Sequence, residues 1–207
     1  YLARLVDRVY VHHPMVPSLL EWWPAGISAR LVEHGPLPVT CAGGEDRERL
    51  RARLGIAAGT TLLVSAGIVR DYKALDRCIP VIRERMAVDP RLHFAVVGRI
   101  VSPAAREALA TLPPEHVTVM DEMLPPEPFD QWLRAADYCL LSYRAILTSG
   151  ALFHAFSLGV PVIAPRLGTL PAYVVEGWNG FTYDGASQLG AVLDRALGAS
   201  PAYRDAL

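Results

Sequence analysis

Lysine is almost absent from this chain of 207 residues: of its 20 basic residues, 19 are arginine and one is Lys73. The 21 acidic residues nearly balance them, which leaves a formal net charge of −1. A chain without excess positive charge lacks the electrostatic footprint of most nucleic-acid-binding proteins. We therefore expect no nucleic-acid partner.

Cysteine is also scarce. Cys41, Cys78 and Cys139 are far apart and form no C-x-x-C pair. Dispersed cysteines in odd number predict reduced thiols, neither a disulfide framework nor a zinc site, and favour a cytoplasmic protein. The neighbours His12 and His13 would face opposite sides of a strand, so we expect no metal site there either.

No apolar run reaches the roughly 18 residues that a membrane-spanning helix needs. The chain opens without methionine on "YLARLVDRVYVHHP", which is typical of a helix end running into a strand. We therefore expect the sequence to be a piece of a longer protein.

Apolar runs and helical patterns alternate after residue 45. Strands are predicted over 60–67, 92–98, 116–120, 138–143, 161–165 and, weakly, 180–184. Helices are predicted over 45–55, 75–87, 103–112, 128–137, 150–159, 170–177 and 187–198. Strands that are apolar throughout, each followed by a helix, indicate a doubly wound, Rossmann-like α/β domain with a parallel sheet. The helix over 75–87 contains Pro80, which is tolerated in a first turn, so Asp76 is the expected N-cap.

The first forty residues have a different pattern. Two strand-like stretches, 8–13 and 29–35, are separated by several prolines, and "PLPVTCAGG" at 36–44 has the composition of a linker. The predicted division is therefore residues 1–40, the end of a preceding domain with its linker, and residues 41–207, the Rossmann-like domain.

Ligands of open parallel sheets bind outside the carboxyl ends of the strands. Four cations follow predicted strands there: Arg70, Lys73, Arg99 and Arg166. A Thr-Ser-Gly sequence at 148–150 opens a helix at the same edge. Cations beside a helix N-terminus favour an anion, most plausibly a phosphate. An ammonium group is a compact charge that suits a diphosphate reached from a loop, although a lone lysine on solvated surface is the plain alternative.

The sequence lacks the G-x-G-x-x-G fingerprint of dinucleotide binding, the P-loop and the G-x-S-x-G elbow of α/β-hydrolases. These absences favour a nucleotide site assembled from several loops.

Five segments of the sequence together resemble one protein family. The segments that carry this resemblance are "VSAGIVRDYKALD", "HFAVVGR", "WLRAADYCLLSY", "SGALFHAFSLGVPVIAPRLGTLPAYV" and "GWNGFTYD". In this order they resemble the C-terminal, donor-binding domain of GT-B glycosyltransferases, family-four-like enzymes above all. The resemblance covers about residues 45–200, and residues 1–40 resemble the end of the acceptor domain and the interdomain linker.

The resemblance implies a sugar transfer from a nucleoside diphosphate sugar, with no cofactor and no metal. It implies that Arg70 and Lys73 hold the diphosphate and stabilise it as it leaves, and that Gly67 lets the backbone approach the ligand. The amide groups of Ser149 and Gly150 would face the phosphates.

Further contacts follow from the same resemblance. Glu122, Met123 and Leu124 match the loop that grips the base through its main chain. Thr148 matches, together with Ser149 and Gly150, the helix start whose N–H groups face the phosphates. Thr169 is a candidate sugar contact, with loop capping as the alternative. Arg99 is expected at the donor through its place at the sheet edge.

The sequence departs from the family where many relatives have two glutamates, since Ile146 and His154 stand there. His154 lies one turn after Gly150 and is expected either to reach a ribose hydroxyl or to pack against the sheet. Tyr143 and Arg144 are the candidates to replace the sugar contact. The departure leaves the donor sugar and the stereochemical outcome open.

We therefore expect the donor half of a glycosyltransferase, which binds nucleotide but is inactive alone. The acceptor, a glycan, lipid or small molecule, is not specified, and peripheral membrane association through the absent domain is one option. The alternatives are a nucleotide-sugar epimerase of the same architecture and a degenerate, non-catalytic domain.

Overall fold

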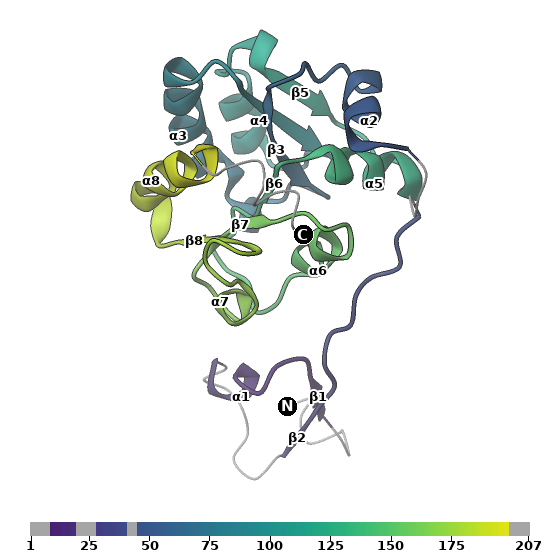
Figure 1. The fold of residues 1–207 in the computed structure, drawn as a ribbon. Helices are drawn as coiled ribbons and strands as arrows, with labels where there is room; N and C mark the ends of the chain where they lie inside the picture. Colours follow the sequence, from purple (N-terminus) through teal and green to yellow (C-terminus); the bar gives the residue numbers. More distant parts are fainter. Residues whose placement is uncertain (1–8, 20–27, 41–44, 199–207) are drawn as a thin grey trace.

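A six-stranded parallel sheet forms the centre of the molecule (Figure 1). The structure is a computed structural model and describes residues 9–19, 28–40 and 45–198. In spatial order the strands are β5 (Val117–Met120), β4 (Leu92–Val97), β3 (Thr61–Ala66), β6 (Tyr138–Leu140), β7 (Val162–Pro165) and β8 (Gly180–Tyr183). All neighbours pair in parallel, which confirms the doubly wound α/β prediction.

Helices cover both faces of this sheet. One face carries α3 (Leu75–Val88), α4 (Pro103–Leu109) and α8 (Gly185–Leu197). The other carries α2 (Arg47–Arg53), α5 (Pro126–Ala135), α6 (Gly150–Ser157) and α7 (Leu170–Tyr173). Two short 3-10 turns, η2 (Asp71–Lys73) and η3 (Pro114–His116), were not expected from the sequence. No helix in the described ranges is long and apolar enough to cross a membrane.

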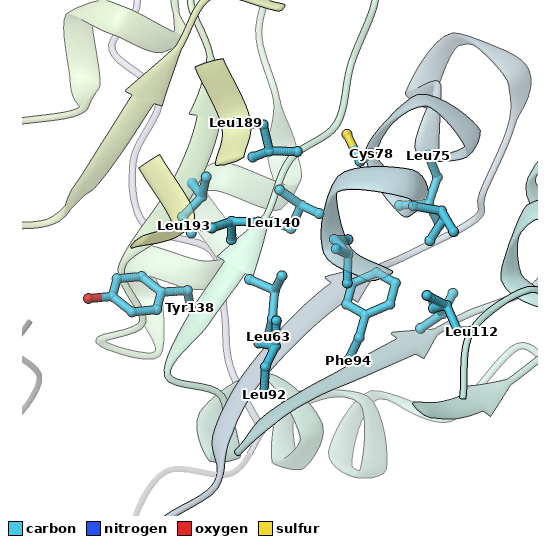
Figure 2. Packing of buried hydrophobic residues seen from close by; sticks show 14 of the residues in the cluster. Leu63, Leu75, Cys78, Leu92, Phe94, Leu112, Tyr138, Leu140, Leu189 and Leu193 are labelled. Atoms are coloured by element: carbon cyan, nitrogen blue, oxygen red, sulfur yellow. The ribbon is translucent and has the colours of Figure 1, made fainter. Parts of the chain in front are cut away.

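Apolar strands make both faces of the sheet part of the core. All six residues of β3 are buried; Leu63 belongs to the hydrophobic cluster on one face, and Leu62, Val64 and Ala66 belong to the cluster on the other. Figure 2 shows the cluster under α3 and α8, where Leu63 and Phe94 from the strands pack with Leu75 and Leu193. A sheet buried on both faces exposes only its ends, so a binding site has to lie at one of these.

The chain reverses its direction of travel across the sheet at β3. From β3 it steps outward through β4 to β5, then returns to pair β6 with the other side of β3. The loops at this switch point diverge, which opens a crevice at the carboxyl ends of β3 and β6.

Two glycines let the loops after β3 and β4 touch. Gly98 has a φ of +130°, and a Cβ atom there would lie 2.7 Å from the carbonyl oxygen of Gly67. Gly67 has a φ of +85°. Any side chain at Gly98 would push these loops apart. The close contact between them therefore requires glycine at this position.

The N-terminal segment contains a separate pair of parallel strands, β1 (Val9–Val11) and β2 (Ala29–Leu31), and a helix, α1 (Val16–Leu19). It contacts the larger unit through aromatic rings: His34 stacks on Phe153 with ring centroids 3.9 Å apart. The Tyr173 hydroxyl donates to the carbonyl of His12. The domain boundary proposed from the sequence stays a prediction. The expected helix end before residue 9 and Cys41 lie outside the described residues.

The helix predicted over 75–87 is confirmed as α3, but its expected N-cap, Asp76, is wrong. The helix begins at Leu75, after Ala74 in the left-handed conformation (φ 46°), so Asp76 lies inside the first turn and Pro80 inside the helix. The turn η2 directly precedes this start and fixes where the helix begins. Pro80 removes one helical hydrogen bond.

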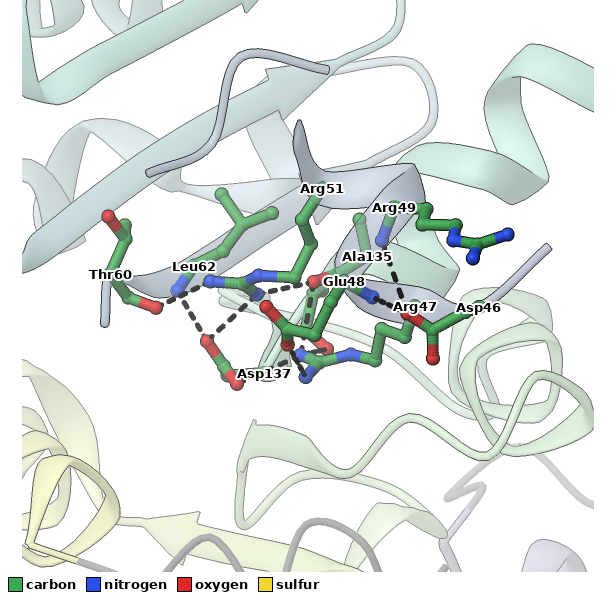
Figure 3. A network of polar contacts seen from close by, with 10 residues as sticks. Asp46, Arg47, Glu48, Arg49, Arg51, Thr60, Leu62, Ala135 and Asp137 are labelled. Carbon is green, nitrogen blue, oxygen red and sulfur yellow. Dashed lines mark hydrogen bonds and ion pairs between the residues drawn. The ribbon is translucent and has the colours of Figure 1, made fainter. Parts of the chain in front are cut away.

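A buried carboxylate joins the sheet to two helices at the opposite, amino-terminal edge (Figure 3). Asp137 accepts hydrogen bonds from the backbone N–H of Leu62 and from the guanidinium groups of Arg47 and Arg51. Arg51 is itself buried and donates to the carbonyl of Ala135. The network ties α2 and the α5–β6 connection to β3.

We predict that Asp137→Ala lowers the free energy of unfolding by about 3–5 kcal/mol, because it leaves the Arg51 charge buried without its counter-ion. Urea unfolding of both proteins measures the change. Asp194→Ala is the matched control, since Asp194 is half-exposed and pairs with Arg85 at the surface. Its loss should cost at most about 1 kcal/mol. Equal effects of the two changes would contradict the role given to the buried network.

Candidate functional site

An open pocket of about 470 Å³ lies at the switch point, between the carboxyl ends of β3 and β6 and the start of α6. Eight residues singled out from the sequence line it. They are Gly67, Arg70, Lys73, Tyr143, Thr148, Ser149, Gly150 and His154. Loops from two strands and the N-terminus of one helix thus converge, as a site assembled from several loops requires.

The other predicted residues lie outside this pocket. Arg99 is exposed after β4, and Glu122, Met123 and Leu124 follow β5, which β4 and β3 separate from β6. Met123 is 63 % exposed. These residues share the carboxyl edge of the sheet with the pocket, and their role toward a base stays a prediction.

The four cations expected along this edge of the sheet do not all line one pocket. Only Arg70 and Lys73 line the pocket. Arg166 follows β7, borders a different pocket, and approaches Glu176 and Asp184 to within 3.6 and 3.4 Å. The sheet is wide, so residues after strands on its two sides do not meet although they share one edge.

Thr169 is completely buried. Its backbone N–H and its hydroxyl both donate to the carbonyl of Leu147, at 2.8 and 3.0 Å. This geometry matches the loop-capping alternative, because the residue holds the loop that leads into α6 and exposes nothing to a ligand.

Lys73 is buried, with only 8 % of its surface exposed. Its Nζ donates to the carbonyl of Ala66 at 2.7 Å, across the turn that follows β3. A Cβ atom on Gly67 would lie 3.2 Å from Nζ, so the glycine leaves room for the ammonium group. Burial lowers the pKa of Lys73 to about 8, so the group is still mostly charged at neutral pH. One hydrogen bond leaves two donor positions of the ammonium group for a ligand.

Hydroxyl groups define the opposite wall. The Tyr143 hydroxyl lies 2.9 Å from Oγ of Ser149, which in turn caps α6 by accepting from the N–H of Leu152. Burial raises the pKa of Tyr143 to about 12, so its hydroxyl stays protonated. Oγ1 of Thr148 is, among the described residues, the one fully enclosed side-chain oxygen or nitrogen without a hydrogen-bond partner. Buried polar atoms are normally paired, so this oxygen is an exception in the structure.

His154 lines the pocket from the second turn of α6, and its ring is oriented by a hydrogen bond to a residue of α5. Its Nε2 lies 2.6 Å from Oδ1 of Asp130, a buried carboxylate on α5. Oδ2 of Asp130 accepts from the N–H and the hydroxyl of Thr40, at 2.7 and 2.8 Å. Burial alone would raise the pKa of Asp130, but the hydrogen bonds from Thr40 and His154 outweigh it and lower the pKa. His154 therefore does not simply pack against the sheet.

Sequence reasoning missed Asp130, Tyr72 and Phe129. Asp130 occupies the buried face of α5 beside Trp132 and Leu133, and an acid on an apolar helix face signals a buried partner. Tyr72 and Phe129 line the pocket. The ring of Tyr72 stacks parallel to that of Tyr143, with centroids 5.9 Å apart.

Comparison with known proteins places this site in a family. Residues 59–198 match the family model of the glycosyl transferases group 1. The chain belongs to this family. The match contains every residue that lines the pocket, so the crevice lies inside the family's own unit.

Curated relatives of this group 1 domain are glycosyltransferases by name. A GDP-mannose:glycolipid 4-beta-D-mannosyltransferase from Xanthomonas campestris is 29 % identical over 68 % of this chain and 43 % of its own. A D-inositol 3-phosphate glycosyltransferase from Corynebacterium efficiens is 31 % identical over 69 % of this chain and 36 % of its own. The chain thus spans about two fifths of the length of these relatives.

Solved structures share the fold. A sucrose-phosphate synthase from Thermosynechococcus elongatus superposes with a TM-score of 0.76 at 22 % identity, over 96 % of this chain and 51 % of its own. HepE from Anabaena, solved in complex with UDP, gives 0.61 at 16 % identity, over 76 % and 44 % of the two chains. These likenesses confirm a Rossmann-like domain of the GT-B type.

We predict that the buried lysine makes stability depend on pH. Between a pH of about 8 and the ordinary lysine pKa of 10.5, the unfolded chain binds a proton that the folded chain has lost. The folded state therefore gains stability as the pH rises through this window. Lys73→Met removes this contribution, so the wild type should gain stability relative to the variant between these pH values. Urea unfolding at several pH values measures this difference. A difference that stays constant would contradict the lowered pKa.

Proposed function

We propose that this chain is the donor-binding part of a glycosyltransferase and that its pocket at the switch point holds the diphosphate of a nucleotide sugar. The observation that carries the proposal is the convergence of Arg70, Lys73 and the N-terminus of α6 on one cavity. Two cations and a row of helix-start N–H groups form a complementary surface for phosphate oxygens.

The mechanism follows from where charge develops. In sugar transfer the bond between the sugar carbon and the diphosphate oxygen breaks, and its electron pair stays on the diphosphate. Donors already fixed beside that oxygen stabilise the developing charge without having to reorganise. Lys73 meets this condition, because the Ala66 carbonyl and burial hold it in place. The acceptor would attack from the part of the protein that lies outside this chain.

The base of the donor is left open. The name of the Xanthomonas relative contains GDP-mannose, whereas HepE was solved with UDP. We propose a nucleoside diphosphate sugar of one of these classes, with its base toward Arg99 and residues 122–124. The nature of the acceptor, metal independence and a cytoplasmic location stay predictions from the sequence.

His154 is proposed to contact the ribose. When a neutral imidazole donates its Nε2–H to Asp130, its Nδ1 is left as an acceptor. An acceptor at this place receives a ribose hydroxyl as a carboxylate would. The buried Asp130 thus gives a histidine the hydrogen-bonding character of the glutamate that many relatives have there. The partly exposed ring, with 22 % of its side chain accessible, faces the pocket that Arg70 and Lys73 line.

Calorimetry tests the role of the lysine. UDP, GDP and ADP are each titrated into the wild type, Lys73→Met and the control Arg83→Gln, which removes an exposed arginine of α3 that does not line the pocket. Lys73→Met should weaken binding of the preferred nucleotide by about 1.5–3 kcal/mol, as expected for a charged hydrogen bond, and Arg83→Gln should leave it unchanged. The absence of binding by any of the three nucleotides would favour a degenerate domain.

The number of protons taken up on nucleotide binding tests whether Lys73 is the group that becomes protonated. At a pH of about 9 the free Lys73 is mostly neutral, and a bound diphosphate should raise its pKa, so that binding takes up close to one proton. Titrations in two buffers of different ionisation enthalpy measure this number. Lys73→Met should abolish the uptake, and an unchanged uptake would assign it to another group.

The ribose contact has its own test. Wild-type protein should bind UDP or GDP more tightly than the matching 2′-deoxy or 3′-deoxy nucleotide, by about 1 kcal/mol for the hydroxyl that is bound. His154→Ala should abolish this preference, and Asp130→Asn should reduce it because it disturbs the orientation of the ring. The binding of inorganic diphosphate by either variant is the control and should not change. A preference that survives in His154→Ala would contradict the proposed contact.

A further inference from the structure

A second pocket of about 240 Å³ opens on the same edge of the sheet, on the far side of the β6–α6 loop. It lies where the starts of α3 and α8 approach the ends of β6, β7 and β8. These two helices run side by side on one face of the sheet (Figure 1). Tyr143 is the single residue that borders both this pocket and the switch-point pocket.

The rim of the second pocket is positively charged. Arg77, Arg144 and Arg166 line it, against one carboxylate, that of Asp184. Arg77 and Arg144 are exposed and form no salt bridge within the described residues. Arg166 is shared between Asp184 and Glu176 at 3.4 and 3.6 Å, both longer than a hydrogen bond. At least two guanidinium groups are therefore available to a ligand.

A buried hydroxyl without a partner lies at this pocket. Ser142 is 6 % exposed and lines the pocket, and its hydroxyl forms no hydrogen bond with any part of the chain that the structure describes. Its oxygen is not among the fully enclosed unpaired atoms, so its small accessible surface opens onto the cavity. A buried serine hydroxyl normally forms a hydrogen bond with the protein. The Ser142 hydroxyl instead borders the second pocket, where a ligand can accept or donate this hydrogen bond.

Helix geometry adds donors at the same place. Gly185 and Ala186, the first residues of the 13-residue α8, line the pocket. The side chain of Asp184 does not cap this helix, and its first turn carries no acid. Ala74, at the start of α3, lines the pocket as well, although Asp76 stands in the first turn of that helix. Free N–H groups and the positive ends of helix dipoles favour an anion.

The floor of the pocket is neutral. Cys78 lies beside the Tyr183 hydroxyl, which donates to the carbonyl of Leu141. Burial raises the pKa of Cys78 to about 11, so the thiol carries no charge that would repel an anion at neutral pH.

We propose that this second pocket binds the phosphate group of a phosphate monoester, separately from the switch-point pocket. Guanidinium forks at Arg77 and Arg144 bind two phosphate oxygens, and the helix start and the Ser142 hydroxyl donate to the phosphate from below. Apolar neighbours such as Pro165 and Leu167 leave room for a small organic group beside the phosphate.

The experiment measures phosphate binding while the first pocket is filled. Inorganic phosphate, glycerol 3-phosphate and glycerol are titrated calorimetrically into the full chain, with and without saturating UDP or GDP. Vesicles that contain phosphatidic acid form a further arm, which separates a lipid phosphate from a free one. The variants are Arg77→Gln, Ser142→Ala and Lys73→Met, with Arg83→Gln on the same helix as the matched control.

We expect glycerol 3-phosphate to bind equally well with and without the nucleotide, and glycerol not to bind. Arg77→Gln should weaken this binding about tenfold or more, and Ser142→Ala severalfold. Lys73→Met should weaken nucleotide binding without affecting glycerol 3-phosphate. Stronger binding to vesicles than to glycerol 3-phosphate would support the site and assign it to a lipid headgroup.

Three results would overturn the proposal: no saturable binding of any phosphate probe at ~10 mM, competition between nucleotide and phosphate, or equal effects of Arg77→Gln and Arg83→Gln. Because the nucleotide is titrated separately, failure of the donor assignment would not be mistaken for failure of this site.

Discussion

The group that the site depends on is a single ammonium ion kept charged where most of its surface is out of water. Lys73 follows the central strand and donates to the last carbonyl of that strand, at Ala66. Burial makes the free charge unfavourable, which shows in the pKa of about 8, and a phosphate at the same place would compensate it. The free-energy cost of burying this charge and the free energy of binding an anion beside it are therefore linked.

Much of the fold was predictable from the sequence because the signals were local. Every strand of the sheet lies within a range that the sequence predicted as a strand, although the signal for β8 was weak. The N-cap of α3 was predicted wrongly, because a short 3-10 turn and Ala74 in a left-handed conformation precede the helix, and neither has a marked composition. A left-handed alanine costs roughly 1 kcal/mol relative to glycine, which tertiary contacts have to offset.

The candidate site was predictable to the extent that parallel topology sends the ends of strands to one edge. This rule brought Arg70, Lys73 and the start of α6 together. The rule does not distinguish the two sides of the β6–α6 loop. The sequence therefore placed Arg166 beside Arg70 and Lys73, whereas Arg166 lines the other pocket. Nor could it reveal Asp130, since the pairing of α5 with α6 across the outer face of the sheet depends on packing between segments far apart in sequence.

Thr40 gives the segment before the domain a direct connection to the pocket. Its main-chain and side-chain donors both end on Asp130, and the other oxygen of that carboxylate holds His154. A displacement of the segment that ends at Thr40 would break both of these bonds and leave His154 as the remaining hydrogen-bond partner of the Asp130 carboxylate. The segment before residue 41 and the wall of the pocket at His154 are thus connected through one buried carboxylate, that of Asp130.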